Sequence, residues 1–377
     1  MCSVVFGILS CVVFFGFSVF NVNALDSTGI WSATTKLPYV LASHASFSTN
    51  NKLFVIDGSA ITGQSHDQIT SAQPNLNGSV TQWTFEPQRT QTALIYHSVA
   101  VKDNYVYILG GKEENPGSSN GFVNKVFLGK IDLSGNIGSW SQVTSLPIRS
   151  GVGAALEYNN RIYYAGGFDE SVWHDEIYFA DINGDGTLGS WVLAGRLPGP
   201  NVGFGMIENN GNLVVISGYE QSSGFVKKSF VAPINPNGVI GSWVGTSELP
   251  EGINRFGLVT VGRTVYLIGG ASNSGKLNKV YYADLNLDGT LGSWGLSNNH
   301  LPQGVCCGSA TVANGYLYLT GGFDNGYLDT VYFAEVGPHN TPTPTPTITS
   351  LTPIILIPGM GASWNYEALV HGTIATD

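Results

Sequence analysis

The chain repeats one pattern six times. Each repeat holds a short apolar strand that ends in one or two glycines and, further on, a tryptophan. By subtraction of positions, the spacings are 52, 57, 51, 52 and 51 residues between Trp31, Trp83, Trp140, Trp191, Trp243 and Trp294. A period of about 50 residues with several short strands is typical of a β-propeller, in which each repeat forms one four-stranded blade. The sequence therefore predicts an all-β propeller of six blades.

Four strands can be assigned in each repeat. In the third repeat, Leu146-Pro147 precedes a strand of small residues at 151–156, and a turn leads to the apolar strand 161–165. Aromatic and β-branched runs of this length, bounded by Gly, Asn and Asp, are strand signals. The apolar strands of the six repeats end at Gly58, Gly110-Gly111, Gly166-Gly167, Gly218, Gly269-Gly270 and Gly321-Gly322.

The two ends of the repeat region complement each other. The last repeat stops at 331–336 without a tryptophan strand, and the first tryptophan strand, at Trp31, has no strands before it. We expect the Trp31 strand to pair beside 331–336 and complete the last blade, because this pairing removes an exposed pair of edges.

The repeat resembles the kelch repeat, with paired glycines closing one strand, tyrosine in the next and tryptophan in the last. The resemblance covers residues 29–337 and is weaker where Asp57-Gly58 and Ser217-Gly218 replace the glycine pair. It implies a kelch-type propeller over residues 25–337, in which aromatic rings pack beside the glycines. A strand glycine marks such a close approach.

The composition limits the class of partner. Charged residues make up 11% of the chain, against roughly 25% in typical domains. The surface must therefore be built from Asn, Ser, Thr and Gly. The formal net charge of −10 argues against nucleic acid, which needs a basic stripe to neutralise phosphates.

An apolar run at residues 4–22, followed by Val22-Asn23-Ala24, predicts a cleaved signal peptide at residues 1–24. No Lys or Arg precedes the run, so the alternative is an uncleaved membrane anchor, since about 19 apolar residues can span a bilayer. We expect a secreted or cell-surface protein that meets a membrane only if the leader is uncleaved.

Residues 338–350 form a Pro-Thr linker, because alternating prolines favour an extended chain and prevent sheet pairing. Residues 351–377 then read as a buried strand running into a glycine-rich turn. They resemble the start of a lipase- or esterase-like α/β-hydrolase, which implies an oxyanion-hole donor at Met360 or Gly361.

This segment contains no Gly-x-Ser-x-Gly nucleophile elbow, so no catalytic residue is assigned. We expect a truncated hydrolase fragment; the alternative is a short tail that matches by chance.

No metal site or cofactor is predicted. The stretches 181–186 and 284–289 look like calcium loops, but their twelfth positions are Val192 and Gly295, so turns between strands explain them better. His44 and His97 occupy matching places without a third ligand, and we expect structural hydrogen bonds there.

Cysteine and arginine are two further residue types that could carry chemistry. Cys306 and Cys307 are the only cysteines after the leader, and we expect small buried thiols in an inner strand rather than a vicinal disulfide. Arg89, Arg149 and Arg255 lie 21, 17 and 14 residues before their glycines, so a convergent arginine triad is not expected.

The loops after the glycines differ most and carry aromatic rings beside carboxylates. This combination suits sugar rings, and it also suits protein partners, whose hot spots favour Tyr and Trp. The predicted ligand contacts are Trp173, Tyr219, Phe323 and Tyr327, with rim hydrogen bonds from Asp169, Glu170, Glu220 and Asp324.

Two functions remain open. The first is a monomeric, secreted kelch propeller that binds a glycan or a protein ahead of the hydrolase-like segment. The alternative is that the propeller is itself a sugar-processing enzyme of the mutarotase, lyase or sialidase kind. We favour the binding module, because an enzyme needs charged residues at the channel mouth and the inner strands carry Gly, Ala, Val, Cys and Ser.

Overall fold

The structure, a computed structural model, describes residues 28–61, 64–90, 92–114 and 121–336. The predicted leader, the linker at 338–350 and the hydrolase-like segment at 351–377 lie outside these residues. The chain divides into two units, Met1–His339 and Asn340–Asp377, and every described residue belongs to the first. Within the described residues we find strands and turns and no helix, so none of them forms a helix that could cross a membrane.

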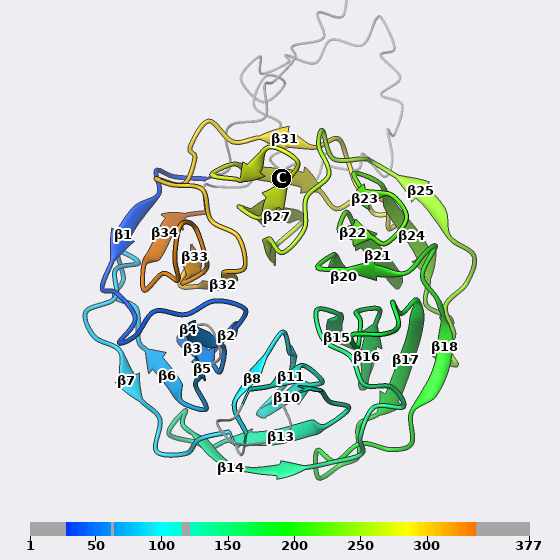
Figure 1. The fold of residues 1–377 in the computed structure, drawn as a ribbon, viewed down its shortest axis with the longest axis horizontal. Coiled ribbons are helices and arrows are strands. Elements are labelled where there is room, and N and C mark those ends of the chain that lie inside the picture. The colour runs from blue at the N-terminus through cyan, green and yellow to red at the C-terminus, as the bar shows by residue number, and fades with distance from the viewer. Residues whose placement is uncertain (1–27, 62–63, 91, 115–120, 337–377) are drawn as a thin grey trace, which may run out of the picture. The chain divides into compact units, whose positions relative to one another are not determined.

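Six four-stranded antiparallel sheets are arranged in a ring, giving a β-propeller-like fold (Figure 1). We number them in the order of their innermost strands. The first three are β2 (Ala45–Thr49), β3 (Lys52–Ile56), β6 (Ile69–Ala72) and β7 (Thr84–Phe85); β9 (Ser98–Lys102), β10 (Tyr105–Leu109), β13 (Val126–Ile131) and β14 (Ile137–Gln142); and β15 (Ala154–Tyr158), β16 (Arg161–Ala165), β17 (Glu176–Asp181) and β18 (Val192–Arg196).

The remaining three sheets follow the same order, except that the outermost strand of the sixth comes from the start of the chain. They are β20 (Gly205–Asn209), β21 (Asn212–Ile216), β24 (Ser229–Pro233) and β25 (Val244–Thr246); β26 (Gly257–Val261), β27 (Thr264–Ile268), β30 (Val280–Asp284) and β31 (Gly295–Leu296); and β32 (Ser309–Ala313), β33 (Tyr316–Thr320), β34 (Val331–Glu335) and β1 (Ser32–Thr34).

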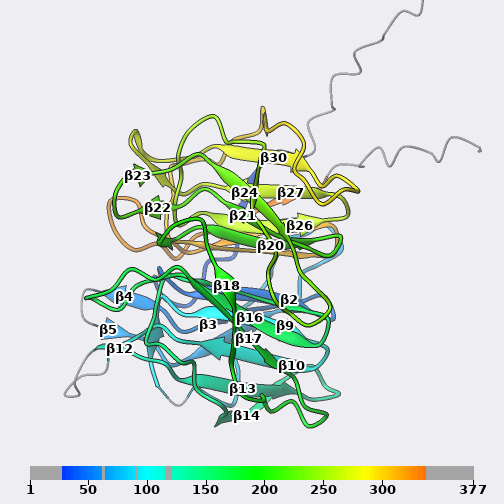
Figure 2. The same cartoon turned by 90° about the vertical axis from the view of Figure 1, so that its right-hand side faces the viewer.

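Short sheets gather on one face of the ring, which we call the loop face (Figure 2). They form where the glycine-ended strands leave the main sheets and where the innermost strands begin. They are β4 (Ser59–Ile61) with β5 (Gln64–Ser65); β8 (Leu94–Ile95), β11 (Lys112–Glu113) and β12 (Gly121–Phe122); β19 (Asn201–Val202), β22 (Tyr219–Glu220) and β23 (Gly224–Phe225); and β28 (Ala271–Ser272) with β29 (Gly275–Lys276).

The core lies between neighbouring sheets. The second strand of each sheet is almost wholly buried, because a neighbouring sheet covers each of its faces. Six hydrophobic clusters result, and each draws its residues from two adjacent sheets, including one that joins the sixth sheet to the first. Burial of both faces explains why these strands read as continuous apolar runs rather than as alternating ones.

The repeated tryptophans join neighbouring sheets. The indole Nε1 of Trp83 donates to the Thr35 carbonyl at 2.9 Å, at the end of the outer strand of the preceding sheet. The same bond recurs between other sheets at 3.0, 2.7 and 3.2 Å, from Trp191 to Thr144, from Trp243 to Arg196 and from Trp294 to Ser247. The tryptophan period in the sequence is therefore the period of these inter-sheet bonds.

Tyrosines of the second strands hydrogen-bond to the following sheet, whereas the tryptophans bond to the preceding one. Tyr107 Oη donates to the Gly186 carbonyl at 2.7 Å, and Tyr318 Oη donates to that of Gly78 at 2.6 Å. Each acceptor lies in the Asn/Asp-Gly turn of the next sheet. The stretch 181–186 thus runs from the end of β17 into the predicted turn, in which Asp185 accepts a 2.9 Å hydrogen bond from the Thr187 N–H.

The predicted pairing of the two ends is present. β1 pairs antiparallel with β34, with Ser32 opposite Phe333 and Thr34 opposite Val331. Thr28 forms a bridge to Val336, and Trp31 is only 4% exposed in the cluster between the fifth and sixth sheets. The start of the described chain therefore supplies the missing strand of its last sheet.

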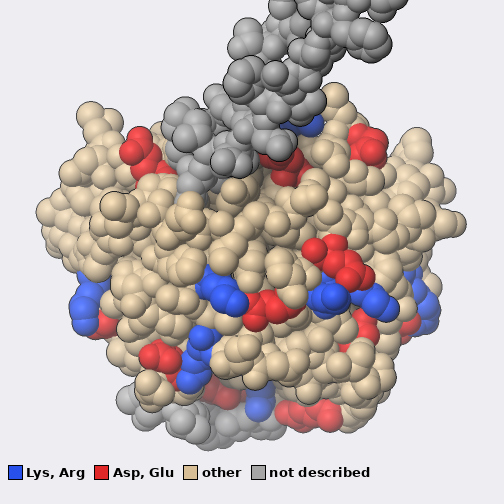
Figure 3. All heavy atoms as spheres, turned by 90° about the horizontal axis from the view of Figure 1, so that it is seen from above, with Lys and Arg blue, Asp and Glu red and all other residues tan. Residues whose placement is uncertain are grey.

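The surface agrees with the low charge content. On the side shown in Figure 3, basic and acidic side chains are scattered over a surface made mostly of uncharged atoms. Several charged side chains of the described residues form ion pairs, such as Lys36 with Asp329 at 2.9 Å and Arg161 with Asp181 at 2.8 Å. Exposed pairs of this kind contribute little to stability.

We predict that Trp31→Ala destabilises the fold by about 3–5 kcal/mol, the usual cost of removing a buried tryptophan. Hydrogen exchange should accelerate at the β34 amides, because β1 loses its anchor. Trp140→Ala is the matched control, since Trp140 is also 4% exposed but lies in the second sheet. An equal acceleration at β34 in both variants would contradict the closing role of β1.

Gly110 and Gly262 allow a second test. Both have a left-handed backbone, with φ of 60° and 57°, but a Cβ on Gly110 would lie 2.3 Å from the Ser150 carbonyl oxygen. A Cβ on Gly262 would meet nothing within 4 Å. Gly262→Ala should therefore lower the free energy of unfolding by only about 1–2 kcal/mol, the cost of holding alanine in a left-handed backbone. Gly110→Ala should lower the free energy of unfolding by about 1–3 kcal/mol more than Gly262→Ala does, because the added methyl group would overpack against Ser150. Chemical denaturation measures both values. Equal costs would show that the close approach is not selective for glycine.

Candidate functional site

Six residues form a ring at the centre of the loop face. Each lies two positions before an innermost strand, and each has a left-handed φ between 50° and 61°. We call this set the mouth ring: Ser43, Tyr96, Val152, Gly203, Arg255 and Cys307.

Backbone hydrogen bonds close the mouth ring. The N–H of each member donates to the carbonyl of the preceding member, as in Arg255 to Gly203 at 2.8 Å and Cys307 to Arg255 at 2.9 Å. The circle is completed from Ser43 to Cys307 at 2.8 Å. The left-handed conformation, unfavourable for a β-branched residue such as Val152, is thus imposed by the closed ring.

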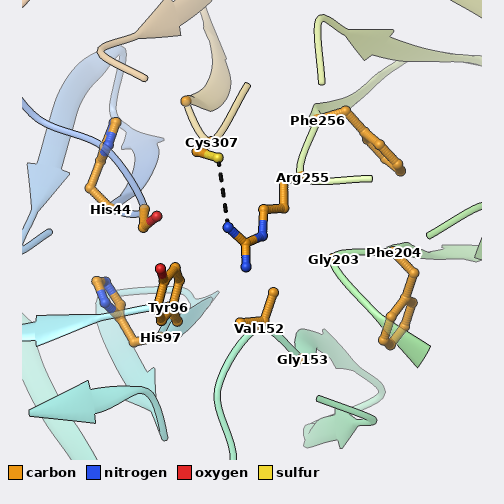
Figure 4. A pocket seen from close by; sticks show the side chains of 12 residues that line it. His44, Tyr96, His97, Val152, Gly153, Gly203, Phe204, Arg255, Phe256 and Cys307 are labelled. Atoms are coloured by element: carbon orange, nitrogen blue, oxygen red, sulfur yellow. Dashed lines mark hydrogen bonds between the residues drawn. The ribbon is translucent and has the colours of Figure 1, made fainter. Parts of the chain in front are cut away.

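The mouth ring and the residue after each member enclose a pocket of about 160 Å³ (Figure 4). Each of the six sheets contributes two lining residues, so the pocket lies on the axis of the ring. The second residues of these pairs are His44, His97, Gly153, Phe204, Phe256 and Gly308.

Arg255 reaches into the middle of the pocket (Figure 4). Its Cζ lies 5.0 Å from the centre of the Tyr96 ring, a cation–π arrangement, and its Nη1 lies 4.0 Å from Cys307 Sγ. Its Nε is buried and has no hydrogen-bond partner among the described residues. A Cβ at Gly203 would lie 2.9 Å from Arg255 Cγ, so the glycine gives the arginine room.

The two cysteines form a thiol pair beside this cation. Cys307 Sγ lies 3.0 Å from Cys306 Sγ. The hydrogen bond between the two thiols and the charges of Arg255 and Lys276 lower the pKa of Cys307 to about 6, although burial opposes the shift. The same hydrogen bond and burial raise the pKa of Cys306. Of the two thiols, Cys307 therefore loses its proton first.

The cysteine prediction was wrong in one respect. Both residues precede β32 rather than lying in it, and Cys307 is only partly buried because it lines the pocket. Cys306 is buried, as expected.

The histidines of the pocket are neutral. Burial lowers the pKa of His44 to about 3 and that of His97 to about 4. His44 Nε2 lies 2.8 Å from Thr320 Oγ1, and that hydroxyl donates to the Ser309 carbonyl, so His44 donates to Thr320. The predicted structural hydrogen bond is therefore present at His44.

A second feature of the loop face is a row of aromatic rings from the short strands and loops that follow the second strands of the second, third and fourth sheets. Successive ring centres lie 4.7, 5.8, 6.1 and 5.0 Å apart. We call this row the aromatic run: Phe122, Phe168, Trp173, Tyr219 and Phe225.

Carboxylates lie along the aromatic run. Asp169 accepts hydrogen bonds from the backbone N–H groups of Ser171 and Val172. Burial alone would raise the pKa of Asp169, but these hydrogen bonds and the nearby charges outweigh it and lower the pKa. Glu170 lies 3.9 Å from Lys112, and Glu220 accepts a hydrogen bond from Ser223.

The other predicted contacts form a separate group in the loop between β33 and β34. The rings of Phe323 and Tyr327 meet edge to face at 5.4 Å, and Lys276 lies 5.1 Å above the Phe323 ring. Asp324 lies 3.8 Å from the same lysine. The structure thus joins Trp173 to Tyr219 and Phe323 to Tyr327, in loops of different sheets. Met360 and Gly361 lie outside the described residues.

Sequence reasoning missed the mouth ring. The distance from Arg255 to the next glycine matches no other arginine, whereas its distance from the inner strand aligns it with Cys307 and Tyr96. Phe168 could have been found from its place after Gly166-Gly167, which Phe323 shares after Gly321-Gly322.

Comparisons with known proteins support the fold. The chain matches no protein-family profile, and it matches no curated protein. Among solved structures, the structure of YjhT is similar with a TM-score of 0.63 and 15% sequence identity, over 82% of this chain and 98% of that chain. A likeness at this level of identity extends to the β-propeller-like fold alone.

We predict that Cys307 reacts with iodoacetamide with a pH midpoint near 6, below the usual value for a thiol. Above this pH the thiolate reacts, and below it the protonated thiol is slow. Arg255→Gln should move the midpoint upward because a stabilising charge is lost. Peptide mapping by mass spectrometry measures the rate, with Arg149→Gln as the exposed-arginine control. A midpoint near 9 in the unaltered chain would overturn the assignment.

Proposed function

We propose that residues 28–336 form a six-bladed kelch-type propeller that acts as a monomeric carbohydrate-binding module, with the loop face as its binding surface. The aromatic run carries this proposal. Four of its five rings are only partly buried, and they lie in one row with Asp169, Glu170 and Glu220 beside them.

The chemistry of a sugar explains why this arrangement favours carbohydrate. The faces of a pyranose ring carry C–H groups that stack on aromatic rings, and its edge carries hydroxyls that donate to carboxylates. Trp173 stands in the middle of the row, between Phe168 and Tyr219. A row of rings extending over three sheets suits a chain of sugar units better than a single unit.

The location outside the cell rests on the predicted signal peptide at residues 1–24. The proposed partnership with a lipase- or esterase-like hydrolase rests on the resemblance at residues 351–377. Both agree with a module that holds a surface polymer close to an attached enzyme.

A second candidate is a sugar-processing enzyme centred on the mouth pocket. The observation in its favour is that Arg255 and the thiolate of Cys307 share a cavity on the axis. Arg255 also places a charged side chain at the channel mouth, where an enzyme needs one. No Asp or Glu is among the residues that line the pocket, so a carboxylate acid–base pair is not provided there.

A glycan array with the full chain tests the binding module. Trp173→Ala should weaken the best hit about 30-fold, equivalent to about 2 kcal/mol, because large amphipathic rings concentrate binding energy. Tyr219→Ala should weaken it as well. Phe85→Ala is the control, since Phe85 is 50% exposed but lies on the outer strand β7. A hit that survives both changes would place the site elsewhere, and capture of a protein with no glycan hit would favour the protein-binding form.

A further inference from the structure

The mouth pocket holds a cation that the protein itself does not pair with a carboxylate. Three of the other arginines have such partners: Arg89 lies 2.8 Å from Asp67, Arg161 lies 2.8 Å from Asp181, and Arg196 bonds to Asp175. Within the described part of the chain, no carboxylate forms an ion pair with Arg255, and its buried Nε has no hydrogen-bond partner. A buried donor without a partner is costly, so a ligand that accepts from it gains affinity.

We propose that the mouth pocket binds the carboxylate of a small organic acid through the guanidinium of Arg255. The guanidinium presents parallel N–H donors whose spacing fits the two oxygens of a carboxylate. The centre of the Tyr96 ring lies 5.0 Å from Arg255 Cζ, and this contact stabilises the cation in the pocket. In Figure 4 the free end of the guanidinium points toward Val152.

The size and lining of the pocket limit the rest of the ligand. A volume of about 160 Å³ exceeds the roughly 30 Å³ that a single water occupies and admits one small molecule. Phe204, Phe256 and Val152 supply apolar walls, and burial keeps His44 and His97 neutral. A single charged group on a compact body fits these walls, whereas a second charge would lie against apolar side chains.

Cys307 reports on this site. Its thiolate lies beside Arg255, so a bound carboxylate places a second negative charge near the sulfur and favours the protonated thiol. The coupling is reciprocal, and the carboxylate should bind more tightly below the thiol pKa than above it. The other charged group that acts on this thiol is Lys276, which also pairs with Asp324 at 3.8 Å.

The test follows alkylation of Cys307 by iodoacetamide at pH 7 in the full chain, read by mass spectrometry. Cys306→Ser is introduced because its hydroxyl still donates to Cys307 and leaves one thiol in the pocket. The probes are acetate and acetamide, which match in shape and differ in charge, at constant ionic strength. Acetate should slow alkylation saturably by about threefold to tenfold, because the added negative charge raises the pKa of the thiol and lowers the fraction present as thiolate. Acetamide should have no effect.

Arg255→Gln should abolish the acetate effect, and Arg149→Gln should retain it. Equal effects of acetate and acetamide, an acetate effect that persists in Arg255→Gln, or one that chloride reproduces would overturn the proposal. If Arg255→Gln does not fold, the chain with Arg255 in place decides the test. Acetate but not acetamide should then slow the alkylation of Cys307 at pH 7, and this difference should disappear at pH 8. No glycan is used, so this result is independent of the aromatic run.

Discussion

Pairing of β1 with β34 is the interaction on which the rest of the ring depends. Each hydrophobic cluster is shared by two neighbouring sheets, so no sheet completes its core alone. The sixth sheet has only three strands from its own repeat, and β1 adds the fourth together with the buried Trp31. Without it, an edge of β34 would be exposed and the cluster between the fifth and sixth sheets would lose a large side chain. An exposed strand edge invites pairing with other chains.

The same closure fixes the geometry of the mouth. Because six sheets return to their starting point, six equivalent backbone segments meet on one axis and bond to one another in a circle. The circle holds five residues other than glycine at a positive φ, which isolated chains disfavour. Arg255 and Cys307 are brought within 4.0 Å by this ring although they are far apart in the sequence.

The sequence was sufficient to predict the four-stranded units, the closing strand and the turns, because each depends on a local signal that recurs every repeat. Trp83, Tyr107 and Gly110 are such signals, and each has the same contact in several sheets. The mouth could not be predicted in this way. Its chemistry comes from single residues at matching positions of different repeats, and their contacts appear only once the ring is closed. The aromatic run was predicted in part, since Trp173 and Tyr219 were chosen but their neighbours Phe122 and Phe225 were not.

The circular bonding of the mouth ring has a consequence for how this pocket can change. Each member uses its own N–H and its own carbonyl within the circle, so the side chains are left to recognise what enters. Serine, tyrosine, valine, glycine, arginine and cysteine occupy the six places, and the backbone bonds of the circle involve none of these side chains. The selectivity of the mouth can therefore change through side-chain replacements that leave the backbone bonds in place, except at Gly203, where a side chain would meet Arg255.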